Sequence, residues 1–431
     1  MTAAHPSAGA PAAAVARARL ATYAVFAGSG LACASWAARI PQVRDHLHLD
    51  ARALGLVLLA TAVGSVVALP ISGHVVGRLG SRRVVAGASW LLSLSFALVA
   101  VGYLFGIVPV VLGLFLFGFA NGTWDVAMNV QGALVERLLG RSVMSRFHAG
   151  FSVGTVAGAL AGAGLVALHV PVSVHLVAVA LVVAVGVPAA TRGMLPDDED
   201  HHGEAGEAGE AEQPSRRGAL AAWGEARTLL TGLFVLAFAF AEGTGNDWIA
   251  VAVIDGYHAP AALGTLAFAL FLAAMTVGRW FGTSLLDRFG RTVVCRWLAV
   301  IATVGVVVFA FGPGTPVAYL GALLWGLGTS LGFPVGMSAA ADDPRRAAAR
   351  VSVVASVGYC AFLGGPPLIG FLGDSLGVRH AVTTVAALLA VAALIASVVR
   401  QPRPADGGQR AGAAGVPSAL PATGDSRSEA R

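Results

Sequence analysis

Long apolar stretches separated by short polar turns occupy most of the chain. A helix of about 20 apolar residues crosses the hydrocarbon core of a bilayer, where only helices and closed barrels can satisfy every backbone hydrogen bond. The pattern therefore predicts an all-α membrane protein with twelve transmembrane helices. We expect these helices over residues 18–40, 53–76, 84–106, 109–134, 145–168, 170–190, 228–252, 260–286, 293–312, 315–340, 349–373 and 378–399.

The second six stretches repeat features of the first six. Trp36 and Trp248 stand at about the same depth in their halves, and Arg78-Leu79-Gly80 recurs as Arg288-Phe289-Gly290, with offsets of 212 and 210 residues. Parallel repeats of this kind build secondary transporters whose substrate site lies near the bilayer midplane. We therefore expect two pseudo-symmetric six-helix bundles, over residues 18–190 and 228–399.

Three segments lack this apolar pattern. Residues 1–17 and 400–431 are rich in small residues, Pro or Arg, and we expect them to be disordered cytoplasmic tails. Residues 191–227 contain an acidic low-complexity run with His201 and His202. A metal site at these histidines is conceivable, but we interpret the segment as a solvated cytoplasmic linker and predict no metal site.

The composition excludes a soluble domain, because 56% of the residues are hydrophobic and 12% are charged. All 28 basic residues are arginine, and 23 of them lie on the side of the two termini. The opposite side holds Arg39, Arg44, Arg52 and Arg379, and Arg279 lies within a helix. The positive-inside rule then predicts a multi-pass protein of the cell membrane with both termini in the cytoplasm. The net charge of +5 gives no indication of nucleic-acid binding.

The loops after the second and eighth predicted helices carry a recognisable motif. Residues 73–83 read Gly-His-Val-Val-Gly-Arg-Leu-Gly-Ser-Arg-Arg, and Asp287-Arg288-Phe289-Gly290-Arg291 is a second copy. Both resemble the loop signature of the major facilitator superfamily, in which this loop locks the cytoplasmic side. The resemblance assigns Arg78, Asp287 and Arg288 to gating. Gly77 replaces the usual aspartate of the first copy, which puts the lock of that half in question.

Further motifs resemble the bacterial branch that includes the rhizopine-locus membrane protein. That branch is similar to fucose-permease-type sugar transporters, which carry an acidic residue followed four positions later by Asn in the fourth helix. The matching segments are Ser-Trp-Ala-Ala-Arg-Ile-Pro at 35–41, Gly-Thr-Trp-Asp-Val-Ala-Met-Asn at 122–129, Phe-His-Ala at 147–149 and Asn-Asp-Trp at 246–248.

A stripe of small and polar residues follows one face of the fourth predicted helix. At about 100° per residue, Gly118, Asn121, Asp125, Asn129 and Gly132 fall in one sector of about 80°. A carboxylate facing lipid costs several kcal/mol, so we expect Asp125 to face a cavity or a partner. Asp125 is then a candidate for proton coupling and substrate binding, with Asn121 and Asn129 as substrate ligands. The alternative is that the stripe packs helices together.

Polar residues also interrupt the first and seventh predicted helices. Glu242 is the second candidate for proton coupling and substrate binding, with Asn246 one turn further along the same face; alternatively, Glu242 is a buried neutral side chain. Trp36 and Trp248 could stack on substrate, while an aromatic belt explains them equally well.

A charged pair is a candidate for the outer gate. Arg39 and Asp247 stand beside the two tryptophans and could pair across the cavity mouth, although Arg39 could simply snorkel to the interface. His148 in the fifth predicted helix and Arg279 in the eighth could contact substrate or relay protons; packing and cytoplasmic anchoring are their alternatives.

The fifth predicted helix contains a hydrolase-like sequence motif in a context where that motif cannot form an active site. Gly150-Phe151-Ser152-Val153-Gly154 matches the nucleophile string of hydrolases, but that motif requires a strand-to-helix turn. The glycines spaced by four residues from Gly150 to Gly162 instead indicate a close-packing ridge. We predict no enzyme activity.

The sequence as a whole predicts a secondary active transporter of a small polar metabolite, sugar-like or cyclitol-like, that works by alternating access and is coupled to protons. Sodium is the alternative coupling ion. No nucleotide-binding loop or cofactor motif is found, and we expect a monomer in the lipid bilayer without nucleic-acid partners. Efflux of a drug or secondary metabolite stays open, although the fifth predicted helix lacks the Gly-Pro pair of proton-driven exporters. A non-transporting ligand sensor is the other alternative.

Overall fold

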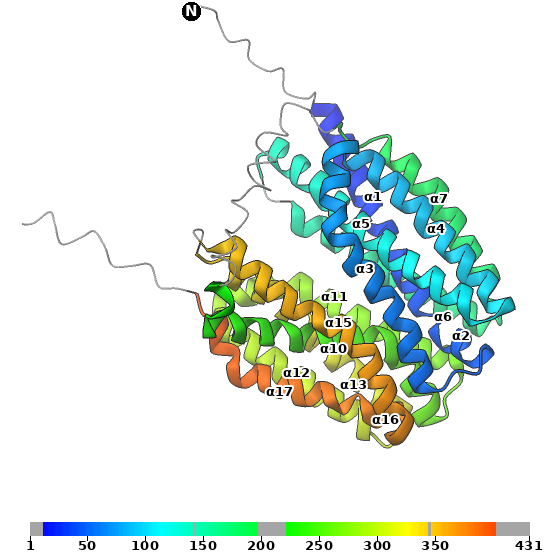
Figure 1. The fold of residues 1–431 in the computed structure, drawn as a ribbon. Coiled ribbons are helices and arrows are strands. Elements are labelled where there is room, and N and C mark those ends of the chain that lie inside the picture. Colours follow the sequence, from blue (N-terminus) through cyan, green and yellow to red (C-terminus); the bar gives the residue numbers. More distant parts are fainter. Residues whose placement is uncertain (1–11, 142, 197–220, 344–345, 402–431) are drawn as a thin grey trace, which may run out of the picture. The chain divides into compact units, whose positions relative to one another are not determined.

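The structure, a computed structural model, describes residues 12–141, 143–196, 221–343 and 346–401 (Figure 1). These residues form helices and connecting turns without a strand, and twelve segments are long and apolar enough to span a membrane. The predicted all-α membrane fold is confirmed. The helices of the first half are α1 (Ala12–Ala37), α2 (Ile40–His46), α3 (Ala51–Leu79), α4 (Ser81–Phe105), α5 (Ile107–Leu139), α6 (Met144–Ala167) and α7 (Val172–Thr191).

The second half continues the same pattern, and two of its spans are interrupted. The tenth span breaks between α13 and α14, and the twelfth consists of three short pieces. The helices are α10 (Ala226–Tyr257), α11 (Ala261–Phe289), α12 (Arg291–Phe311), α13 (Thr315–Thr329), α14 (Gly332–Ala340), α15 (Ala347–Leu376), α16 (Val378–Ala381), α17 (Thr383–Ile395) and the 3-10 helix η2 (Ala396–Val399).

Several helices extend beyond their predicted ends. The helix α1 begins at Ala12, so residues 12–17, which we expected to be a disordered tail, are helical. The apolar pattern ends where a helix leaves the membrane, whereas backbone hydrogen bonding continues into the polar residues beyond it. Residues 1–11 and 402–431 of the predicted tails, and the acidic linker run with His201 and His202, lie outside the described residues.

The repeat has an offset of 210 residues in the structure. Ala51–Leu79 and Ala261–Phe289 match at both ends, and Gly80 and Gly290 end these helices with φ of 79° and 78°, a left-handed region that favours glycine. The prediction that Trp36 corresponds to Trp248 is therefore wrong, because its offset is 212. Two residues rotate a helix face by about 200°, and the structural counterpart of Trp36 is Asn246.

The glycine ridge of α6 packs directly on α1. A Cβ at Gly154 would collide with the carbonyl oxygen of Ala27, and one at Gly158 would lie 2.6 Å from that of Leu31. Small residues allow helices to approach closely in a membrane, where packing replaces the hydrophobic effect as the driving force. The ridge is therefore a structural feature, and Ser152 is a buried residue of this packed helix.

The two halves meet along α3 and α15 and along α6 and α11. We call the end of the bundles that contains α2 the α2 end, and the end with the Gly80 and Gly290 turns the terminal end. At the α2 end, a Cβ at Gly55 would lie 2.5 Å from the carbonyl oxygen of Pro366, and one at Gly370 would lie 2.6 Å from that of Ala51. The backbones of α3 and α15 are thus in close contact there.

We predict that Gly154→Ala destabilises the protein by about 1–3 kcal/mol, because the added methyl must displace the α1 backbone. Thermal unfolding of the purified protein in detergent measures this loss. Gly164→Ala on the same helix is the matched control, since a Cβ at Gly164 meets nothing within 4 Å, and alanine there favours the helix. Equal stability of the two variants would contradict the packing role of the ridge.

Candidate functional site

A cavity of about 430 Å³ lies between the two halves, within the volume range of small-molecule sites. It is lined by α1, α3, α5 and α6 of the first half and by α10, α11 and α15 of the second. Large apolar side chains include Trp36, Phe117, Phe151, Phe268 and Phe362. The polar lining residues are Cys33, Thr61, Ser65, Asn121, Asp125, Thr155, Glu242, Thr244, Asn246, Asp247, Thr276, Arg279 and Tyr359.

The repeat explains which helix faces line this cavity. Positions 33, 34, 36 and 37 of α1 correspond at the 210-residue offset to 243, 244, 246 and 247 of α10, and all eight line the cavity. On α3 and α11 the match extends to Leu69 and Arg279. The duplicated scaffold therefore sets the shape of the cavity, while its charge is asymmetric and lies mainly on the second half.

Asp125 of α5 lines the cavity, as its place on the polar stripe predicts, and is solvent-exposed within it. The Asn129 amide donates to the Asp125 backbone carbonyl at 2.8 Å and to its Oδ1 at 3.3 Å. No ion pair of Asp125 occurs among the described residues. Asn129 is not a lining residue, so in this structure it orients the carboxylate instead of facing the cavity itself.

The rest of the α5 stripe divides between packing and lining. A Cβ at Gly118 would collide with the carbonyl oxygen of Thr61, and one at Gly132 would press on Met144. Asn121 does both, since its Oδ1 accepts from Ser29 Oγ at 3.3 Å and from Cys33 Sγ at 3.2 Å on α1, while the residue also lines the cavity. Both interpretations of the stripe thus apply: the two glycines pack helices together, Asp125 lines the cavity, and Asn121 does both.

Glu242 and Arg279 form an ion pair within the second half. Arg279 Nη2 donates to Glu242 Oε1 at 2.9 Å, and Arg279 Nε donates to the Ser330 carbonyl at 3.3 Å. Both side chains line the cavity and are partly accessible, at 23% and 30%. Arg279 is therefore placed where it compensates the charge of Glu242, at cavity depth.

The Arg39–Asp247 ion pair, which we expected as an outer gate, is not formed. Arg39 is 1% exposed, and its Nε donates to His175 Nδ1 at 2.8 Å inside the first half. The chain breaks between α1 and α2 at this point, which turns the side chain toward α7. Asp247 lines the cavity and has no hydrogen-bond or ion-pair partner among the described residues.

Two further candidates lie outside the lining. Trp248 is completely buried and does not line the cavity, whereas Trp36 does. His148 is exposed and packs edge-on against Phe26, with ring centroids 5.2 Å apart. Asn246 lines the cavity beside Asp247, so the structure assembles Trp36, Asn121, Asp125, Glu242, Asn246 and Asp247 around one cavity.

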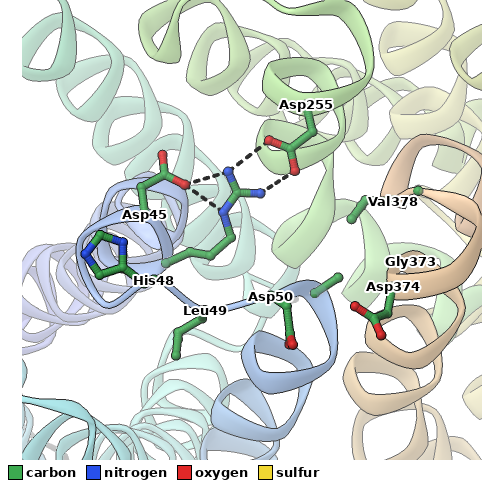
Figure 2. Close-up of a pocket in the computed structure, with 11 residues that line it drawn as sticks. Asp45, His48, Leu49, Asp50, Asp255, Gly373, Asp374 and Val378 are labelled. Atoms are coloured by element: carbon green, nitrogen blue, oxygen red, sulfur yellow. Dashed lines mark hydrogen bonds and ion pairs between the residues drawn. The ribbon is translucent and has the colours of Figure 1, made fainter.

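An ion pair that sequence reasoning missed joins the halves at the α2 end. Arg44 on α2 contacts both carboxylate oxygens of Asp255 on α10, with Nη2 to Oδ1 at 2.9 Å, and its Nε also donates to Asp45 at 2.8 Å. The Arg44 guanidinium thus bonds both carboxylates. All three residues line a second pocket, in which Figure 2 labels Asp45, Asp255 and Asp374. The spacing of Arg44 and Asp255 in the sequence gives no signal for this pair.

The motif residues at the terminal end make no such connection. Arg78, Asp287 and Arg288 are exposed, and no hydrogen bond or ion pair joins any of these three to the other half within the described residues. Arg288 lies over the ring of its neighbour Phe289 at 5.2 Å. The structure is therefore closed at the α2 end, while the motif loops of the two halves are not locked together.

We predict that Arg44→Asp and Asp255→Arg each loosen the α2 end, because each places like charges opposite one another, and that the double variant restores closure. The measurement is the rate at which an impermeant maleimide, added at the α2 end of oriented vesicles, modifies the cavity residue Cys33 in a Cys360→Ser background. Partly exposed ion pairs contribute about 1 kcal/mol, so each single change should raise the rate about two- to fivefold. A double variant as reactive as the single ones would rule out the gate.

Comparisons with known proteins agree with this architecture. The family model described as Major Facilitator Superfamily matches residues 20–364 and 248–429. An uncharacterised transporter of Sinorhizobium fredii is 33% identical over 385 residues, covering 87% of this chain and 96% of its own. Membrane protein MosC of Rhizobium meliloti is 26% identical, covering 84% of each chain.

Solved structures show the same fold at low sequence identity. A nucleoside transporter, NupG, superposes with a TM-score of 0.72 at 14% identity, covering 90% of this chain and 99% of its own. The fucose transporter FucP in its outward conformation gives a TM-score of 0.61 at 17% identity, covering 89% and 98%. At these identities the likeness concerns the fold alone.

Proposed function

Since the chain belongs to the major facilitator superfamily, we propose that it carries a small polar metabolite across the cell membrane by alternating access, driven by the proton gradient. One observation supports this most directly. A single cavity between the two repeats holds Asp125 on one half and Asp247 on the other, both without an ion-pair partner among the described residues. Carboxylates at membrane depth are costly unless water or cargo reaches them.

The polar lining favours a hydroxylated cargo. Asn121, Thr244, Asn246 and Thr276 offer amide and hydroxyl groups, and Trp36 offers a flat apolar face. One structural neighbour is described as a fucose:proton symporter and another as a nucleoside transporter. We extend to this chain only the class that the lining itself favours, a sugar-like or cyclitol-like metabolite.

Proton coupling is assigned to Asp125 and to the Glu242–Arg279 pair. Asp125 has a single side-chain partner, the neutral Asn129, so it can take up a proton without breaking an ion pair. A proton on Glu242 would instead weaken its 2.9 Å contact with Arg279 and free the guanidinium to move. The two sites would then respond differently to the same proton gradient.

Orientation follows from the charge distribution. By sequence, 23 of the 28 arginines belong to the loops and tails on the side of the two termini, so we propose that the terminal end faces the cytoplasm. The α2 end then faces outward, and the described conformation is closed to the outside. The cavity lies within a single chain, which fits a monomeric transporter.

We predict that Asp125→Asn lowers substrate-driven proton movement at least tenfold, because an amide cannot carry a proton through the cycle. The assay uses proteoliposomes with an internal pH dye and a metabolite panel, repeated with a sodium gradient. Asp374→Asn is the matched control, since Asp374 is exposed outside the cavity and has no ion pair among the described residues.

Three other results would each contradict a part of the proposal. Full proton movement by Asp125→Asn would exclude this carboxylate as the coupling site. Transport that follows sodium alone would replace the coupling ion. Ligand binding without transport by the parent protein would indicate a sensor.

A further inference from the structure

We propose that the cargo is a hydroxylated amine, and that its ammonium group binds between Asp125 and Asp247. This inference rests on the proposed transport function and narrows its substrate class. It starts from the charges of the lining. The cavity contains three carboxylates, Asp125, Glu242 and Asp247, and one cation, Arg279. Arg279 is paired with Glu242 at 2.9 Å, so two carboxylates are left without a cation.

These two carboxylates come from opposite halves of the molecule. Asp125 lies on α5 and Asp247 on α10, and both line the same cavity. A carboxylate at membrane depth needs a proton or a cation to offset its desolvation. With a neutral cargo only protons could compensate both carboxylates, and an anionic cargo would add repulsion, whereas an ammonium group compensates them and at the same time links the two halves.

The remaining lining suits a cation that also carries hydroxyl groups. Trp36, Phe151, Tyr359 and Phe362 surround the cavity with aromatic rings, and the faces of such rings attract ammonium groups. Thr244 is a lining residue that is only 3% exposed, and its buried Oγ1 has no hydrogen-bond partner among the described residues. A buried hydroxyl in that state can bond a cargo hydroxyl.

Competition for the same carboxylates follows from this geometry. A carboxylate holds either a proton or an ammonium contact, so cargo release accompanies proton uptake and the exchange is antiport. The titratable groups that face the cavity are Cys33 on α1, Asp125 on α5, Glu242 and Asp247 on α10, Arg279 on α11 and Tyr359 on α15. Arg279 is engaged with Glu242, which leaves the two aspartates as the shared site.

The test measures ligand-induced thermal stabilisation of the purified protein with matched pairs of compounds. The pairs are glucosamine with glucose, galactosamine with galactose, and glucamine with sorbitol; N-acetylglucosamine and glucuronate add neutral and anionic controls. We expect the amines to stabilise the protein at pH 7, where they carry the ammonium charge, and to lose affinity as the pH falls further and protons compete for the carboxylates. Asp125→Asn and Asp247→Asn should each weaken amine binding at least about tenfold, and Asp374→Asn should not.

A second variant distinguishes the loss of the Asp247 charge from a defect in folding. Asp247→Glu keeps the negative charge, so it should retain the preference for amines that Asp247→Asn loses. The melting temperatures without ligand show whether each variant is folded. An effect of Asp247→Glu equal to that of Asp247→Asn would assign the residue a structural role and overturn the inference.

Other outcomes distinguish this inference from the proposed function. Stronger stabilisation by a neutral or anionic compound, or none by any amine, would overturn the amine site. Proton movement driven by glucose or sorbitol would then leave the transport function standing. Amine binding without amine transport into proteoliposomes would support the cation site and contradict the proposed transport function.

Discussion

The hydrocarbon core offers no water to a backbone group or a charge, and this constraint governs most of the structure. All twelve membrane spans satisfy their backbone through helices. The charged side chains at cavity depth, Asp125, Glu242, Asp247 and Arg279, all line the space between the halves. These charged residues are tolerated in the middle of the membrane because the fold places them on an internal cavity and exposes apolar side chains to the lipid.

Because lipid tails are as apolar as the helices, the hydrophobic effect does not drive helices together within the membrane. Helix association depends instead on how closely the backbones approach each other. Glycine provides that approach in two different settings. Within the first half, Gly154 and Gly158 hold α6 on α1. Between the halves, Gly55 and Gly370 bring α3 onto α15 at the α2 end. The first contact belongs to a rigid bundle, and the second would have to separate in an alternating cycle.

The sequence predicts the spans, the repeat and the cavity position of Asp125, because apolar length and helical periodicity follow directly from the bilayer and from helix geometry. Side-chain direction near helix ends was harder to predict. Trp248 and Arg39 were expected at the cavity mouth, but both are buried inside their own halves. An alignment offset of two residues misplaced the first, and the break between α1 and α2 turned the second. Pairing across the halves, as in Arg44 and Asp255, leaves no periodic trace at all.

The short helix α2 has an energetic consequence. It is separated from α1 by two residues, and Arg39 at that break bonds to His175 of α7. The segment that bears Arg44 is therefore fixed to the first half and contacts the second half through its ion pair with Asp255. Its ion pair with Asp255 is partly open to water and contributes about 1 kcal/mol. Millimolar to micromolar ligand binding releases about 4 to 8 kcal/mol. A ligand that prefers the form open at the α2 end needs only a small fraction of that energy to outweigh the Arg44–Asp255 ion pair, so occupancy of the cavity would then control the opening of that end.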